Sequence, residues 1–114
     1  MPYPIFNETE AMERVFDPDL LKELLIDFSN MKELDWTAFD RYFQENDLTA
    51  IELASHSIKG VAGNLALTGI YLTATALNDS LKMGEIALSK RHYEQLKYEV
   101  ERFRTFLHQY LKEN

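Results

Sequence analysis

The stretch from Ala54 to Asn64 places one histidine where it could act as a nucleophile. If this stretch is helical, each residue turns the chain by about 100°, so His56 points away from the apolar face. That face consists of Ile51, Ala54, Ser55, Ile58, Ala62 and Leu65. An imidazole has an unperturbed pKa of about 6.5, which leaves one ring nitrogen free to attack near neutral pH. A phosphorylated imidazole is a good leaving group toward a carboxylate, so the residue favours reversible phosphoryl transfer.

Lys59, Gly60 and Gly63 follow His56 at helical spacing. The two glycines come four and seven residues after the histidine, on the same outward stripe. Glycine inside a helix is destabilising by roughly 0.5 to 1 kcal/mol relative to alanine, so two glycines beside one histidine indicate a need for clearance. The ammonium of Lys59 could stabilise a dianionic phosphoryl group on the ring. Together these residues predict a site at which His56 reacts and Lys59 stabilises the transferred group.

Leu53 and Ser57 border the outward stripe. If both side chains are exposed, they form part of a partner-docking patch around His56, together with Gly60 and Gly63. Leu53 could equally be an isolated surface leucine or pack against an N-terminal helix.

The N-terminal half of the chain contains two legible helix starts. Asn7 followed by Glu10 resembles a capping box and predicts a short helix over about 8–15. Asp17 followed by Pro18 predicts a second start, because proline is tolerated at the first helical position. Apolar residues then recur at intervals of three and four up to about residue 45, which is compatible with one long bent helix or with two that abut.

The histidine lies in the next predicted helix, over about 48–66. Asn46 and Asp47 interrupt the chain before it, and Thr49 with Glu52 offers another capping box. We expect this helix to bury its apolar face and to expose His56.

Two further helices complete the pattern. Thr68 is a candidate cap for a helix that ends near Gly84, and Ser89 is the expected start of the last one. The core face of the first is predicted to be Ile70, Ala74, Leu77 and Leu81, and that of the last Tyr93, Leu96, Val100, Phe103, Leu107 and Tyr110. The prediction is an all-α fold: one domain over 1–114, an antiparallel four-helix bundle with an additional short N-terminal helix.

The composition argues against several classes of function. The chain has 114 residues, a formal net charge of −7 and no basic stripe, so nucleic acid is not an expected partner. It has no cysteine, which excludes disulfides and thiolate metal sites. Glu52 and His56 lie four residues apart, but no second Glu-x-x-His motif accompanies them, so no metal site is expected.

The sequence gives no indication of a membrane protein. No apolar run approaches the ~20 residues of a membrane span, and the N-terminus lacks the features of a signal peptide. A cytoplasmic location is therefore expected.

The segment His56-Ser-Ile-Lys59-Gly60-Val-Ala62-Gly63 resembles the signature H-x-[IL]-K-G-x-[AS]-[AG] of histidine-containing phosphotransfer (HPt) domains. His56 falls where this family carries its phosphorylated histidine, and Lys59, Gly60 and Gly63 match positions that flank the phosphoryl group. The helical pattern on both sides extends the resemblance over most of the chain. One departure concerns the backbone at the end of the histidine helix: Ala66 stands where many members have glycine.

The resemblance implies a phosphocarrier without autonomous kinase activity. Such a domain accepts a phosphoryl group from the aspartate of a receiver domain and passes it to another receiver. The partners would be response-regulator receiver domains and a hybrid sensor kinase. The resemblance also implies that Mg²⁺ is held by the receiver, so no cofactor is expected on this chain. An outward histidine on a self-contained bundle favours a monomer.

Two other interpretations remain open. The chain could be a helical adaptor that binds partners without chemistry, which replacement of His56 by Gln would leave intact. It could also be the phosphoacceptor part of a sensor kinase. That family usually has an acidic residue directly after the histidine and a proline a few residues on, whereas here Ser57 follows and no proline occurs after Pro18.

Overall fold

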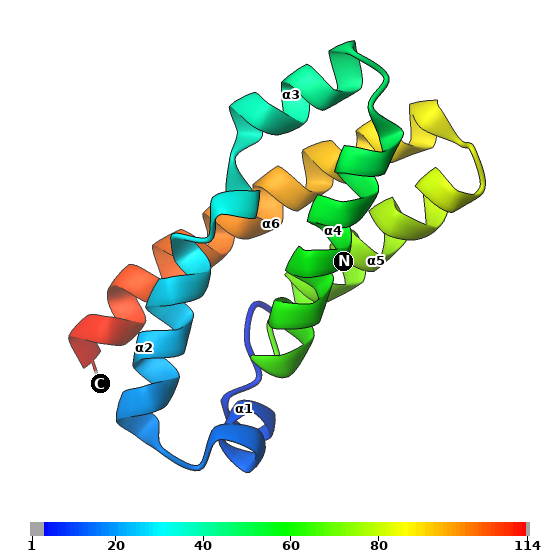
Figure 1. Ribbon diagram of the computed structural model, residues 1–114. Helices are drawn as coiled ribbons and strands as arrows, with labels where there is room; N and C mark the ends of the chain where they lie inside the picture. The colour runs from blue at the N-terminus through cyan, green and yellow to red at the C-terminus, as the bar shows by residue number, and fades with distance from the viewer. Residues whose placement is uncertain (1–3, 114) are drawn as a thin grey trace.

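The computed structural model describes residues 4–113. These residues form six α-helices and one short 3-10 helix, η1, and no strand occurs among them. In chain order the elements are α1 (Glu8–Val15), α2 (Pro18–Ser29), η1 (Lys32–Leu34), α3 (Trp36–Gln44), α4 (Leu48–Asn64), α5 (Thr68–Lys82) and α6 (Ile86–Glu113), as Figure 1 shows. The prediction of an all-α fold is confirmed.

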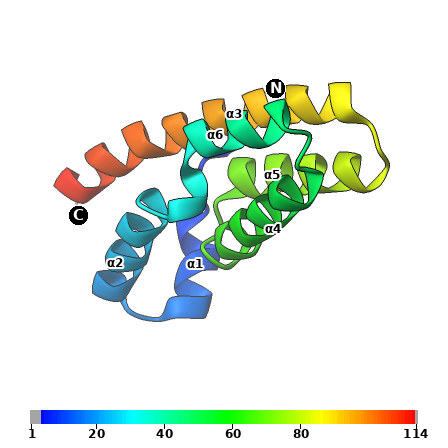
Figure 2. The same ribbon diagram turned by 45° about the horizontal axis from the view of Figure 1, so that its top comes forward.

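The helices run up and down alternately, as expected for an antiparallel bundle. Helix α5 packs extensively against both α4 and α6. The fourth position of the bundle is shared by α2 and α3, which η1 joins, while α1 lies beside α2 near the C-terminal end of α4 (Figure 1). Helix α6 is the longest, and its C-terminal part extends past α5 (Figure 2). No helix within the described residues is long and apolar enough to span a bilayer.

The apolar stretch up to residue 45 forms two α-helices. Helix α2 ends at Ser29, and the N–H of Asn30 returns to the carbonyl of Ile26 at 3.2 Å. Helix α3 begins at Trp36, after Asp35, whose carboxylate accepts the N–H of Ala38 at 3.1 Å. A new cap so soon after the first helix ends restarts the helix in another direction.

The caps predicted for the first two helices are confirmed, whereas the residues predicted to cap the next two helices are wrong, although the histidine helix begins at Leu48 as predicted. The side chains of Asn7 and Asp17 cap α1 and α2 as predicted. At α4 the cap is Asp47, whose carboxylate accepts the N–H of Ala50 at 3.1 Å, and Thr49 already lies within the helix. A carboxylate also interacts favourably with the positive end of the helix dipole. At α5, Thr68 is the first helical residue rather than the cap.

The last helix begins earlier than predicted. Helix α6 starts at Ile86, three residues before Ser89. The hydroxyl of Ser89 is buried, where it donates to the carbonyl of Glu85 and contacts Ser80 Oγ at 2.8 Å. Ser89 thus stabilises the α5–α6 contact from within helix α6. The sequence alone cannot distinguish this role from helix capping, because serine serves in both.

Aromatic rings of α2 and α3, which share one position of the bundle, pack against α6. Phe28 of α2 meets Phe103 edge to face, with ring centroids 5.6 Å apart. Phe39 of α3 stacks on Tyr93 with centroids 5.1 Å apart, and Trp36 borders the same ring. All but the last of the predicted core residues of α6 are buried, and Tyr110 is half-buried. The amphipathic pattern of this helix is therefore confirmed.

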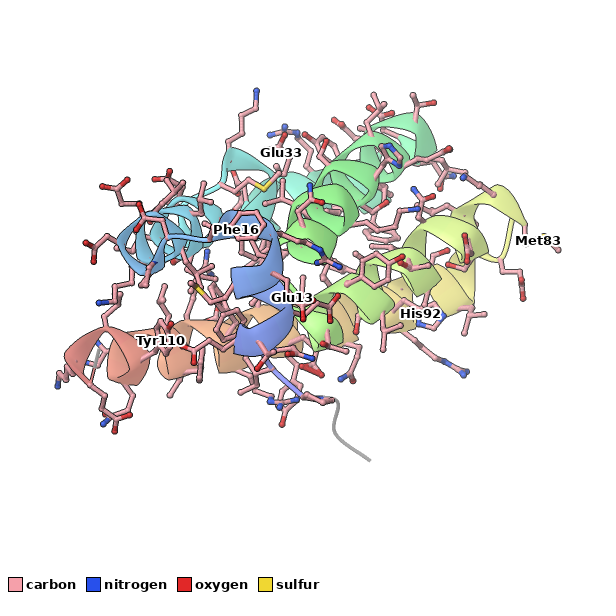
Figure 3. All side chains as sticks on the ribbon, turned by 90° about the horizontal axis from the view of Figure 1, so that it is seen from below. Glu13, Phe16, Glu33, Met83, His92 and Tyr110 are labelled. Atoms are coloured by element: carbon pink, nitrogen blue, oxygen red, sulfur yellow. The ribbon has the colours of Figure 1, made fainter. Side chains whose placement is uncertain are left out.

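Two tyrosines of α6 donate hydrogen bonds to carboxylates. Tyr93 donates to Asp40 at 2.7 Å and to the carbonyl of Trp36 at 3.1 Å. Tyr110 donates to Glu8 of α1 at 2.5 Å, and Figure 3 shows it on the C-terminal part of α6 close to α1. Burial and the bond to Glu8 raise the pKa of Tyr110 to about 12. Burial and the bond to Asp40 also raise the pKa of Tyr93 above its usual value.

We predict a loss of stability at alkaline pH from these two tyrosines. Because the folded chain favours the neutral phenols, this contribution is complete below pH ~10, the pKa of an unperturbed tyrosine. It is lost as the pH rises toward about 12, the folded pKa of Tyr110. Urea unfolding at several pH values should show this decline, and Tyr93→Phe with Tyr110→Phe should flatten it. The exposed Tyr98→Phe variant is the control, and an equal flattening there would contradict the assignment.

Candidate functional site

Helix α4 presents His56 to solvent. Ile51, Ser55, Ile58 and Ala62 are buried on its opposite face, and Ala54 is half-buried. The predicted orientation is therefore confirmed: the apolar face packs into the bundle while the imidazole stays accessible. No group of three or more His, Cys, Asp or Glu residues that could hold a metal occurs within residues 4–113.

The surface beside His56 is bare at Gly60. A Cβ built on this exposed glycine would meet no atom within 4 Å, so the chain itself sets no steric requirement there. Lys59 is half-buried and lies on the same helix, three residues after the histidine. Residues at this spacing are neighbours on a helix surface, so the ammonium can approach a group carried by the ring.

Gly63 serves packing within the chain. A Cβ at this position would lie 3.0 Å from Cδ1 and 3.1 Å from Cε1 of Tyr71, so the ring from α5 rests against the backbone of α4. The space at Gly63 is thus partly filled by the protein's own side chain. Its role in partner docking stays a prediction, but the structure supplies a second reason for the glycine.

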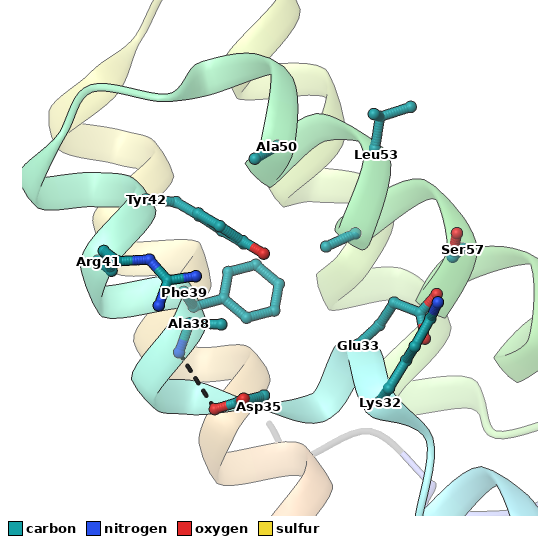
Figure 4. Close-up of a pocket in the computed structure, with 11 residues that line it drawn as sticks. Lys32, Glu33, Asp35, Ala38, Phe39, Arg41, Tyr42, Ala50, Leu53 and Ser57 are labelled. Carbon is teal, nitrogen blue, oxygen red and sulfur yellow. Dashed lines mark hydrogen bonds between the residues drawn. The ribbon is translucent and has the colours of Figure 1, made fainter.

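Leu53 and Ser57 line a groove between α4 and the η1–α3 segment. The groove has a volume of about 490 Å³, and Leu53 is 65% exposed at its edge (Figure 4). Phe39 and Tyr42 form part of its apolar wall. The charged residues of the lining are two cations and two anions: Lys32, Arg41, Glu33 and Asp35. Leu53 therefore borders α3 rather than the N-terminal helix, and it is one edge of a continuous hollow.

A second groove, between α2 and α4, was not predicted. Its volume is about 440 Å³, and its walls are mostly apolar. The lining residues are Leu24, Asp27, Phe28, Met31, Val61, Asn64 and Leu65. The sequence pattern gave the apolar residues of α2, but not the fact that α2 and α4 lie close enough to leave a groove between them.

Helix α4 ends in a left-handed turn centred on Ala66. Its φ is 56°, and the N–H of Leu67 donates to the carbonyl of Ala62 at 2.9 Å. This pattern is the Schellman motif, whose left-handed position is usually glycine. The sequence pattern indicated that Ala66, in place of the usual glycine, affects the backbone at the end of the histidine helix, and this is confirmed. Alanine adopts a left-handed conformation there that costs roughly 1 to 2 kcal/mol.

Arg14 of α1 caps the same end of α4. Its Nη1 donates to the carbonyl of Gly63 at 2.6 Å and reaches that of Asn64 at 3.4 Å, and its Nη2 pairs with Glu10 at 2.5 Å. These carbonyls lie in the last turn of α4, and that of Gly63 also accepts the N–H of Ala66 at 3.2 Å. A cation at a helix C-terminus also offsets the negative end of the dipole. No local sequence signal connects residues 49 positions apart.

The comparison with known families identifies this architecture. The fold and the site define a class of protein: an all-helical bundle in which one helix, α4, exposes a histidine. The family model of the Hpt domain matches residues 10–106, which is most of the chain. The chain belongs to the Hpt domain family. No curated protein and no solved structure matched it.

We predict that Arg14 stabilises the end of the histidine helix. A hydrogen bond from a charged donor contributes about 1.5–3 kcal/mol, but the Arg14 side chain is 43% exposed, so water would replace part of it. Arg14→Met should therefore lower the free energy of unfolding by about 1 kcal/mol, as measured by urea denaturation. Arg91→Met, at an exposed arginine of α6, should change it by less than about 0.5 kcal/mol. Equal losses in both variants would refute the capping role.

Proposed function

We propose that this protein is a phosphorelay intermediate that carries a phosphoryl group on His56. Membership of the Hpt family implies phosphotransfer in two-component signalling. The observation that supports His56 as the carrier is its exposure on α4, with Lys59 beside it and the bare surface of Gly60 one turn away.

The proposed transfer needs no nucleotide on this chain. The unprotonated ring nitrogen of His56 attacks the phosphorus of an aspartyl phosphate on a receiver domain. A nitrogen–phosphorus bond forms while the bond from phosphorus to the carboxylate oxygen breaks, and the second ring nitrogen keeps its proton. Transfer to the next receiver reverses these steps with another aspartate as acceptor. Family members are in general phosphocarriers without kinase activity of their own.

Lys59 would stabilise the charge of the transferred group from this chain, and a Mg²⁺ ion held by the receiver would supply further positive charge. The transferred group spreads negative charge over its equatorial oxygens, and catalysis consists mainly of positioning and of stabilising that charge. Lys59 supplies one cation from this chain, and the receiver contributes the metal ion.

The expected partners are receiver domains, including one from a hybrid sensor kinase. A standard interface buries about 800 Å² on each partner, so a domain centred on His56 covers much more than the histidine. Leu53, Ser57 and Gly60 would lie within such a footprint, as would the mouths of both grooves. We expect the encounter to take place in the cytoplasm, with this chain acting as a monomer.

The deciding experiment is phosphoryl transfer from a set of phosphorylated receiver domains to the purified protein. Acid-labile label should appear on the wild type and be reduced to background in His56→Gln, because the amide cannot act as the nucleophile. His92→Gln and His108→Gln are matched controls that should label normally. Label persisting on His56→Gln would refute the assignment. No label from any donor, with the helical fold intact by circular dichroism, would favour a binding module without chemistry.

Gly60→Ala separates stability from docking. Alanine in the helix interior should raise the free energy of unfolding by roughly 0.5 to 1 kcal/mol, because its Cβ meets nothing within 4 Å in the free protein. A docked receiver would meet that Cβ, so transfer should slow by about 10-fold, or ~1.4 kcal/mol. Urea denaturation and transfer kinetics measure the two effects. A stabilised variant with an unchanged transfer rate would show that Gly60 provides no clearance.

A further inference from the structure

A small polar cluster is buried between α4 and α5, on the inner side of the histidine helix. Ser55 and Asn78 are both 0% exposed. The Nδ2 of Asn78 donates to the carbonyl of Glu52 and to Ser55 Oγ, each at 3.1 Å. Ser55 Oγ in turn donates to the same carbonyl at 3.1 Å. Two side chains from two helices thus converge on one backbone oxygen of α4.

That oxygen belongs to the turn that carries His56. In an α-helix the carbonyl of one residue accepts the N–H of the residue four positions later, so the Glu52 carbonyl is the helical acceptor for the amide of His56. Asn78 therefore ties α5 to the backbone turn of the histidine itself. The imidazole points outward from this turn, while the hydrogen bonds of Asn78 and Ser55 reach the turn from the bundle interior.

The cluster has a cost in stability that an apolar residue would avoid. Asn78 Oδ1 is buried and makes no hydrogen bond within the described residues. An unsatisfied buried acceptor costs about 1 to 3 kcal/mol. The predicted core positions of α5, Ile70, Ala74, Leu77 and Leu81, are all buried. The buried hydroxyls of Thr73 and Ser80 on the same helix are hydrogen-bonded, so Asn78 differs from both in leaving a buried acceptor unpaired. A polar residue at position 78 therefore asks for a reason other than stability.

Directional bonds supply that reason, because apolar burial decides which face of a helix is inside while hydrogen bonds define its rotation more closely. The tip of a side chain lies about 5 Å from the helix axis, so a rotation of about 20° moves it by about 2 Å. A misplacement of 1 Å at a reacting group can reduce a rate by about 10²-fold. Hydrogen-bonded polar networks in a core can rigidify one arrangement at some expense of stability.

We infer that Asn78, through Ser55 and the Glu52 carbonyl, is a positioning residue that fixes the rotation and register of the His56 turn against α5. This inference rests on the proposed function for its catalytic consequence. The structural claim, that Asn78 fixes the His56 turn against α5, applies to the free protein whatever its function.

The test is Asn78→Leu, which keeps the branch at Cγ and removes the donor. We expect little loss in the free energy of unfolding, because the orphaned acceptor is removed together with the donor. Amide hydrogen exchange at residues 56–60 should accelerate at least about threefold relative to wild type, while exchange in α6 stays unchanged. The maximal single-turnover rate of transfer should fall by about 10-fold or more. The half-saturating receiver concentration should change by less than about twofold, because Asn78 is buried away from any partner.

The matched control is the double variant Ser80→Ala with Ser89→Ala. It removes another buried polar pair, Ser80 of α5 and Ser89 of α6, whose Oγ atoms are 2.8 Å apart. Within the described residues the hydroxyls of this pair bond to each other and to the carbonyls of Leu77 and Glu85, none of which lies in α4. The control should leave both exchange at 56–60 and the transfer rate at wild-type values. If Asn78→Leu does not fold, Ser55→Ala tests the same cluster by removing one hydroxyl.

The outcomes separate this inference from the proposed function. Wild-type exchange at 56–60 in Asn78→Leu, or equal acceleration in the serine control, would overturn the positioning role. If the wild type accepts no phosphoryl group from any receiver, the proposed function fails, and hydrogen exchange still decides whether the cluster holds the turn. Faster exchange with an unchanged transfer rate would overturn the catalytic consequence, since the bonds of Asn78 would then have no effect on the reaction of His56.

Discussion

The structure depends above all on the packing of α4 against α5. Helix α5 is central, since α4 covers one side of it and α6 the other, and most of its described length is buried. Burying the apolar face of α4 contributes about 25 cal/mol for each Å² removed from water. Because that face must point inward, the residues opposite to it are forced outward, and His56 is one of them. The same burial that stabilises the bundle therefore exposes the imidazole.

The ends of α4 are fixed by different means. Asp47 begins the helix with a local side-chain cap, so this end depends on residues three apart. The other end depends on contacts from far along the chain: Arg14 donates to the carbonyl of Gly63, and the N–H of Asn7 donates to that of Ala66. The short helix α1 thus stabilises the histidine helix where Ala66 adopts the unfavourable left-handed conformation.

Glycine has opposite physical consequences at two positions of α4. At Gly60 no part of the folded chain approaches, so the absence of a side chain leaves an open surface. At Gly63 the Tyr71 ring occupies the space next to the backbone, so the absence of a side chain permits contact between α4 and α5. The two residues are indistinguishable in the sequence pattern, yet a substitution would strain the packing only at the second.

The sequence by itself determined the helical class, the exposure of His56 and the caps at Asn7 and Asp17. These features depend on periodicity and on residues within one or two turns, and local geometry fixes both. Local patterns failed where two residues could serve as a cap, as at Thr49 and Asp47, and where a serine had a tertiary partner, as at Ser89. Only the tertiary structure decided that Arg14 caps α4, that Tyr71 packs on Gly63 and that Asn78 bonds the Glu52 carbonyl. Each of these contacts joins residues from different helices, and their meeting depends on how whole helices pack rather than on the spacing of residues along the chain.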